Sequence, residues 1–113
     1  MINIDIIRQI ALSLPEATEE PHFEKTSFRV NKKIFATVAP GSSTAMVKLS
    51  LADQDVCCTF DSAVIYPVPN KWGMQGATYI NLLTVREDML TEMLKAAYCA
   101  IAPKHLAEQV KFK

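Results

Sequence analysis

Glycine, cysteine and long apolar runs are all scarce in this chain of 113 residues. Its three glycines form neither G-x-G-x-x-G nor G-x-x-x-x-G-K-[ST], so the sequence lacks the loops with which many enzymes cradle a dinucleotide or a triphosphate. The longest apolar run, residues 96–102, is far shorter than the roughly 20 residues that span a bilayer. Asp5 and Arg8 interrupt the first apolar stretch, so we expect neither a signal peptide nor a membrane span.

The cysteine pattern excludes two further classes of protein. The chain has three cysteines, and two of them, Cys57 and Cys58, are adjacent, a spacing that rarely satisfies disulfide geometry. We therefore expect Cys57, Cys58 and Cys99 to be thiols in a reducing cytoplasm. No Cys-x-x-Cys occurs, and His22 and His105 lie far from the cysteines in sequence, so we expect no metal site and no other cofactor.

Charge is balanced over the whole chain but not along it. Twelve Lys and Arg residues match 12 Asp and Glu residues, a net charge of zero, which argues mildly against non-specific affinity for DNA. Residues 1–24 carry five acids and a single arginine, whereas residues 25–48 carry five cations and no acid. The middle of the chain is therefore the part best suited to an anionic partner.

The first half of the sequence predicts one helix and three strands. Asn3 is a suitable N-cap for a helix over residues 4–13, which Pro15 ends. Residues 16–25 are predicted to be irregular, because Pro21 cannot donate to a β-ladder. A period of two then predicts strands over 26–30, 33–39 and 44–49, the first two joined by an Asn31-Lys32 turn, with Ile34, Ala36 and Val38 on one face.

The second half predicts two helices and two strands. Ser50 is a suitable N-cap for a short helix over residues 51–60, and strands are expected over 64–68 and 77–83. Thr84 and Glu87 match a capping box ahead of an apolar stripe of helical period that runs to Pro103. Residues 1–113 are thus expected to form a single α+β domain with an antiparallel sheet of about five strands.

Catalytic candidates are few. His22 lies among Glu19, Glu20 and Glu24 and could be a general base, but a histidine that packs beside Phe23 is the interpretation we favour. The cysteines stand in apolar surroundings, which favours buried packing over a nucleophilic role. His105 is expected at the surface. We therefore expect a protein that is not an enzyme.

Two features favour a binding surface. Arg29 and Lys48 are predicted on the non-core face of the strands, with Lys32 and Lys33 at the turn, where they could contact phosphates, and Phe35 could stack or pack there. The alternative is a solvated face whose lysines prevent aggregation. Lys71 and Trp72, in the turn region 67–76, suggest a contact surface, although a tryptophan that covers a sheet edge explains them equally well.

The order and spacing of several segments resemble the MmcQ/YjbR family of small bacterial proteins over about residues 4–107. The matching segments are Leu14-Pro15-Glu16, Ser27-Phe28-Arg29-Val30, Lys33-Ile34-Phe35-Ala36, Met46-Val47-Lys48-Leu49-Ser50 and Ala97-Tyr98-Cys99-Ala100-Ile101-Ala102-Pro103-Lys104. The family often has Gly-Trp before its last strand, whereas here Gly76 precedes Ala77 and Trp72 lies four residues before that glycine.

The resemblance implies an α+β fold with a curved antiparallel sheet, N-terminal and C-terminal helices and a short middle helix. That sheet is similar to the DNA-binding domain of a phage transcription factor, and family members are commonly described as DNA-binding. The leading hypothesis is weak binding of double-stranded DNA through the sheet face. The expected contact residues are Arg29, Lys32, Lys33, Lys48, Lys71 and Trp72. The alternatives are a protein-interaction or small-ligand module that uses the turn from Pro67 to Trp72 and, less favoured, an enzyme that uses His22.

Overall fold

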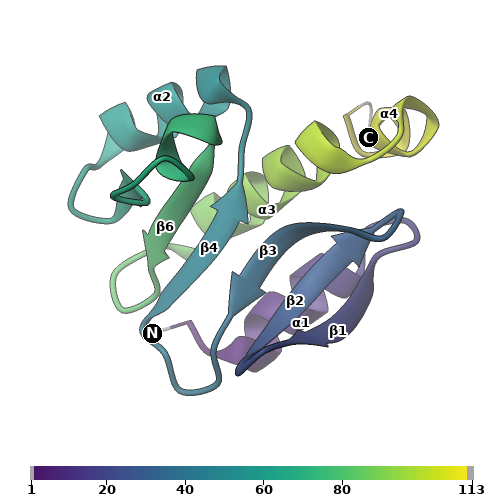
Figure 1. The fold of residues 1–113 in the computed structure, drawn as a ribbon, viewed down its shortest axis with the longest axis horizontal. Coiled ribbons are helices and arrows are strands. Elements are labelled where there is room, and N and C mark those ends of the chain that lie inside the picture. Colours follow the sequence, from purple (N-terminus) through teal and green to yellow (C-terminus); the bar gives the residue numbers. More distant parts are fainter. Residues whose placement is uncertain (1, 112–113) are drawn as a thin grey trace.

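The computed structural model describes residues 2–111, which form a six-stranded antiparallel sheet in the order β1-β2-β3-β4-β6-β5 (Figure 1). In chain order the elements are α1 (Ile4–Leu12), β1 (Thr18–His22), β2 (Lys25–Val30), β3 (Lys33–Val38), β4 (Thr44–Lys48), α2 (Leu51–Phe60), β5 (Ile65–Pro67), the 3-10 helix η1 (Gly73–Gln75), β6 (Ala77–Asn81), α3 (Glu87–Ile101) and α4 (Lys104–Lys111). The predicted α+β class and the single antiparallel sheet are confirmed.

The sheet has one strand more than the sequence suggested. Residues 18–22, predicted to be irregular, form the edge strand β1 and pair with β2. Pro21 lies opposite Thr26 in this pair. A proline is tolerated there because an edge strand leaves one row of backbone groups outside the ladder, so the missing N–H need not cost a hydrogen bond.

The helices α1 and α3 cover one face of the sheet and lie behind it in Figure 1. Phe28, Val47 and Ile80 project from the strands into this core and are fully buried. The register of β2 and β3 shifts at Phe28 and Arg29, so that Phe28 pairs with Ala36 and Arg29 with Ile34. This bulge reverses the expected side of Ile34, which faces away from the helices instead of sharing a face with Ala36.

Phe35 is the extra residue of the bulge and belongs to the core. Its side chain is fully buried, and its ring lies 5.6 Å from that of Tyr98 on α3, edge to face. Of the two roles that the sequence allowed, packing is therefore correct and stacking on the basic surface is wrong.

The helix caps show where local signals hold. Asn3 Oδ1 accepts from Ile6 N at 3.0 Å and Ser50 Oγ accepts from Asp53 N at 3.1 Å, as predicted. The capping box at Thr84 is wrong, because α3 begins at Glu87. The Thr84 N–H is already directed to Asn81 O, in a turn that continues from β6. The helix α4, which follows Pro103, was not predicted.

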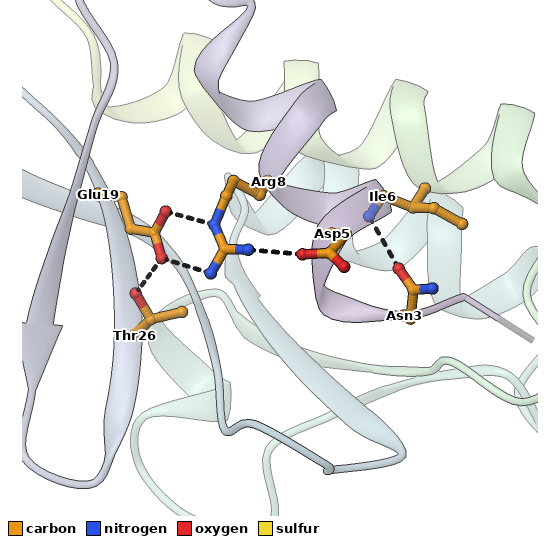
Figure 2. A network of polar contacts seen from close by, with 6 residues as sticks. All are labelled: Asn3, Asp5, Ile6, Arg8, Glu19 and Thr26. Carbon is orange, nitrogen blue, oxygen red and sulfur yellow. Dashed lines mark hydrogen bonds and ion pairs between the residues drawn. The ribbon is translucent and has the colours of Figure 1, made fainter.

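A polar network ties α1 to β1 on the helix-covered side (Figure 2). Arg8 Nε donates to Glu19 Oε1 at 2.7 Å, and Thr26 donates to the other oxygen of that carboxylate at 2.9 Å. The hydrogen bond from Arg8 holds the pKa of Glu19 below its usual range, against the partial burial of the group. Among the described residues, this acid of the opening segment is therefore ion-paired with Arg8 and with none of the cations of residues 25–48.

Candidate functional site on the open face of the sheet

Within residues 2–111, no α-helix covers the face of the sheet opposite α1 and α3 (Figure 1). Cross-strand pairing places one row of side chains across it, formed by Ser27, Thr37, Met46, Tyr79 and Tyr66. The rings of Tyr66 and Tyr79 lie 5.8 Å apart. Directly paired residues share a face, so this row marks a mixed polar and aromatic surface that looks away from the core.

Two adjoining hollows indent this open face. Their volumes are about 540 Å³ and about 460 Å³, and both are lined by Lys25, Thr37, Met46 and Tyr79. They therefore form one depression, called the sheet groove below. One end of the groove reaches Tyr66 on β5, and the other end reaches Lys48, His22 and Trp72.

The sheet groove is cationic in its lining. Lys25 and Lys48 line it, and no aspartate or glutamate of residues 2–111 does. Among the side chains that the structure describes, the ion pairs are Arg8 with Asp5 and Glu19, Arg86 with Asp88, and Lys104 with Glu108. The ammonium groups of Lys25 and Lys48 therefore have no carboxylate oxygen within 4.0 Å in the described part of the chain.

Acidic residues limit the groove on the β1 side. Glu20 and Glu24 line a separate hollow of about 360 Å³ over the β1–β2 hairpin, beside Lys25. Glu20 shares the open face with Ser27, its partner across the two strands. An anion on the open face is thus attracted by the centre of the sheet and repelled at this edge.

The predicted cations of β2–β4 occupy three different places. Lys48 lines the groove, and its partner across the strands is Ala77. Arg29 lies over the β1–β2 hairpin, where its Nε donates to Ser27 Oγ at 2.9 Å and an NH2 hydrogen bond of 3.4 Å reaches Pro21 O. Lys32 and Lys33 are exposed at the β2–β3 turn.

The β2–β3 turn itself has the predicted form. Asn31 and Lys32 have φ values of 51° and 66°, and two successive positive values match the two-residue hairpin turns that follow the twist of the strands. Lys32 and Lys33 therefore stand at the tip of the β2–β3 hairpin, which β1 and β4 flank within the sheet.

Trp72 and Lys71 lie on the opposite side of the groove, in the loop between β5 and β6. Trp72 is 54% exposed and lines the groove, whereas Lys71 is exposed beside it. The loop is closed by backbone hydrogen bonds from Val68 N to Ala77 O and from Ala77 N to Trp72 O, both 3.0 Å. Asn70 Oδ1 also accepts from Trp72 N at 2.9 Å.

Gln54 of α2 anchors this loop from below. Its buried amide nitrogen lies 2.8 Å from Gly73 O and 3.2 Å from Ala77 O. Gly76 is the second anchor, because its φ of 108° and the closeness of Leu49 O leave no room for a side chain. The backbone position of Trp72 is thus determined by the hydrogen bonds and packing that hold the loop.

Several groove residues were missed by the sequence interpretation. Lys25 was counted among the cations but not among the contact residues, because the segment before it was read as irregular. Met46 and Tyr79 line the groove, and the alternation of residues along β4 and β6 was the available signal for them. The β2–β3 bulge, which places Ile34 on the groove side of the sheet, cannot be predicted from a single sequence.

The surroundings of the catalytic candidates follow from their positions in the fold. The ring of His22 lies 4.9 Å from that of Phe23, as the favoured interpretation had it, and His22 also borders the groove. Burial raises the pKa of the Cys57 thiol, and the charge of Asp53 adds to the effect. Burial likewise raises the pKa of Cys58. Both thiols are therefore protonated and poorly nucleophilic at neutral pH.

Residues 2–111 contain neither a cluster of three or more metal-ligating side chains nor a helix long and apolar enough to cross a bilayer.

Comparison with known proteins supports the fold. A family model described as YjbR matches residues 12–100. The crystal structure of a Deinococcus radiodurans protein, DR2400, which is described as containing a DUF419 domain, is similar with a TM-score of 0.77. It is 19% identical in sequence, and the match covers 100% of this chain and 91% of that one. No curated protein matches the sequence.

Proposed function

We propose, on the premise that this chain belongs to the YjbR family, that it is a non-enzymatic cytoplasmic domain that binds double-stranded DNA weakly through the open face of its sheet. The observation that carries the proposal is the cationic lining of the sheet groove. Lys25 and Lys48 lie there without a carboxylate partner, on the one face of the sheet that α1 and α3 leave uncovered.

The turn of the β2–β3 hairpin supports the same proposal. The strands β1 and β4 flank this hairpin in the sheet, but the tip carries exposed cations that can approach phosphates. Lys32 and Lys33 occupy that tip, and Lys71 stands beyond the groove on the β5–β6 loop. Phosphate contacts of this kind position a protein on DNA without reading its sequence.

The acidic residues at the β1 edge of the sheet are the reason to expect a low affinity for DNA. Glu20 and Glu24 at the β1 side repel phosphates, so the DNA path is confined to the strip from the hairpin tip across β4 to the β5–β6 loop. About four phosphates fall within such a strip, and their neutralisation gives a slope of log K against log salt of about −3.6.

The test is a titration of a fluorescein-labelled mixed-sequence duplex, followed by anisotropy at several salt concentrations. We expect the stated slope for the wild type and loss of binding for the double variant Lys33→Glu/Lys48→Glu. Arg86→Glu/Lys104→Glu is the matched control, since both side chains are exposed and lie outside the groove lining, at 83% and 90% exposure. Equal binding by the wild type and by Lys33→Glu/Lys48→Glu at low salt would eliminate the proposal.

The second candidate is a protein-interaction or small-ligand module that uses the turn from Pro67 to Trp72. The specific observation in its favour is Trp72, which is more than half exposed on a loop that the fold holds in place. Trp72→Ala would then weaken the partnership and leave the salt dependence of binding unchanged.

A further inference from the structure

We propose that the part of the sheet groove between Trp72 and Lys48 is a binding site for a small organic anion with a flat aromatic body. The aromatic body lies on the floor that Met46 and Tyr79 form, and the anionic group meets Lys48 and Lys25. This inference does not depend on DNA binding, because it concerns one end of the groove and a ligand that carries one charge.

The volume and lining of this part of the groove match those of ligand sites. Its volume is about 460 Å³, within the range of roughly 300–1,000 Å³ that small-molecule sites occupy. Ile34, Met46 and Ala77 supply apolar floor atoms, and Trp72 supplies an aromatic side. Such sites combine a mainly apolar surface with a few polar groups that fix the orientation of the ligand.

The charge of the lining selects an anion. Lys25, Lys48 and His22 border this part of the groove, with no acidic side chain among the lining residues. A cationic ligand would be repelled by two ammonium groups that have no carboxylate partner. A neutral aromatic ligand would make no ion pair with them. A ligand that joins a ring to a carboxylate, sulfonate or phosphate satisfies both the floor and the lysines.

The aromatic side of the site is preformed. Trp72 N donates to Asn70 Oδ1, and the Gln54 amide holds the carbonyls of Gly73 and Ala77. A ligand that docks against Trp72 therefore need not order the loop first, and preorganisation of this kind reduces the cost of binding. The exposed part of the indole is the apolar surface that the ligand would remove from water.

The test uses the single tryptophan of the chain, whose indole N–H gives one assignment-free resonance in a ¹⁵N-labelled sample. The probe is naphthalene-2-sulfonate, and 2-naphthol is its neutral counterpart with the same ring system. We expect the sulfonate to shift the indole resonance saturably, with an affinity about 3- to 10-fold higher than that of the naphthol.

Lys48→Gln should lower the affinity for the sulfonate toward that for the naphthol, with the remaining difference due to Lys25, while Lys104→Gln on α4 should leave it unchanged. A third variant, Phe60→Ser, removes an exposed aromatic ring on α2 and should have no effect on the titration. Equal affinity for the two probes, an unchanged affinity in Lys48→Gln, or no shift of the indole resonance would each overturn the inference. Failure of the duplex titration with success here would remove the DNA proposal alone.

Discussion

Replacement of Gln54 by methionine should loosen the loop that carries Trp72 and destabilise the whole domain. Gln54 is buried in α2, and its amide nitrogen donates to the carbonyls of Gly73 and Ala77 at 2.8 and 3.2 Å. Methionine has nearly the same length and helix propensity as glutamine, so the substitution removes the donors and changes little else.

The magnitude follows from the two hydrogen bonds. Each contributes about 0.5–1.5 kcal/mol to the free energy of unfolding, while each carbonyl keeps one backbone donor, from Gly76 N to Gly73 O and from Val68 N to Ala77 O. The expected loss is therefore about 1–3 kcal/mol. For a domain of this size, that corresponds to a fall of about 4–12 °C in Tm.

The assay is urea unfolding followed by the fluorescence of Trp72, with Asp55→Asn as the control on the exposed side of α2. We expect the control to stay within about 0.5 kcal/mol of the wild type. We also expect faster amide exchange for Ala77 in Gln54→Met, because its N–H bonds within the loop. A loss of stability below about 0.5 kcal/mol would refute the view that Gln54 anchors the loop.

Three further predictions concern the fold that holds the groove. Glu19→Gln should lower the urea midpoint at pH 7, and the difference in midpoint between this variant and the wild type should shrink between about pH 5 and pH 3. Arg8 lowers the folded-state pKa of Glu19, so the stabilisation by the Glu19 carboxylate is lost once this group is protonated. A difference in midpoint that stays constant with pH would contradict this. Phe35→Ala should cost about 3–5 kcal/mol, because it leaves a cavity against Tyr98, and an unchanged unfolding midpoint would place Phe35 outside the core. Gly76→Ala should cost at least about 2 kcal/mol through its positive φ, measured by thermal unfolding, and a Tm equal to that of the wild type would show that the backbone can relax there.

Local signals predicted much of the fold correctly. Asn3 and Ser50 cap their helices as expected, because a cap depends on side-chain and backbone groups within three residues. Features that depend on a partner strand could not be read in the same way. Residues 18–22 form the strand β1 because they pair with β2, although Pro21 disfavours a strand on local grounds.

The site was predicted less completely than the fold. Lys48 was placed on the correct face by alternation, and Trp72 on the correct loop by its turn residues. The groove itself is lined by side chains from all six strands and from the β5–β6 loop, so no single segment of the sequence predicts it. The β2–β3 bulge, which sends Phe35 into the core and Ile34 to the open face, is a relation between two strands and has no local signature.

The distribution of the cations bears on the choice between a phosphate-binding face and a solvated one. Lys48 and Arg29 lie on the open face, whereas Lys33 pairs with the buried Val30 and so stands at the hairpin tip toward the helix-covered side. These three cations therefore do not converge on one point. The groove end beside Trp72 brings Lys25 and Lys48 next to an aromatic side chain, as the proposed small-ligand site requires.

The most direct measurement is a map of amide and indole chemical-shift changes in ¹⁵N-labelled protein on addition of a mixed-sequence duplex at low salt. The account predicts that the changes concentrate on the β2–β3 tip, on β4 near Lys48 and on the indole of Trp72, and that they fade as salt is raised. Changes confined to α1, α3 or α4, or no changes at all, would contradict the claim that the open face of the sheet binds nucleic acid.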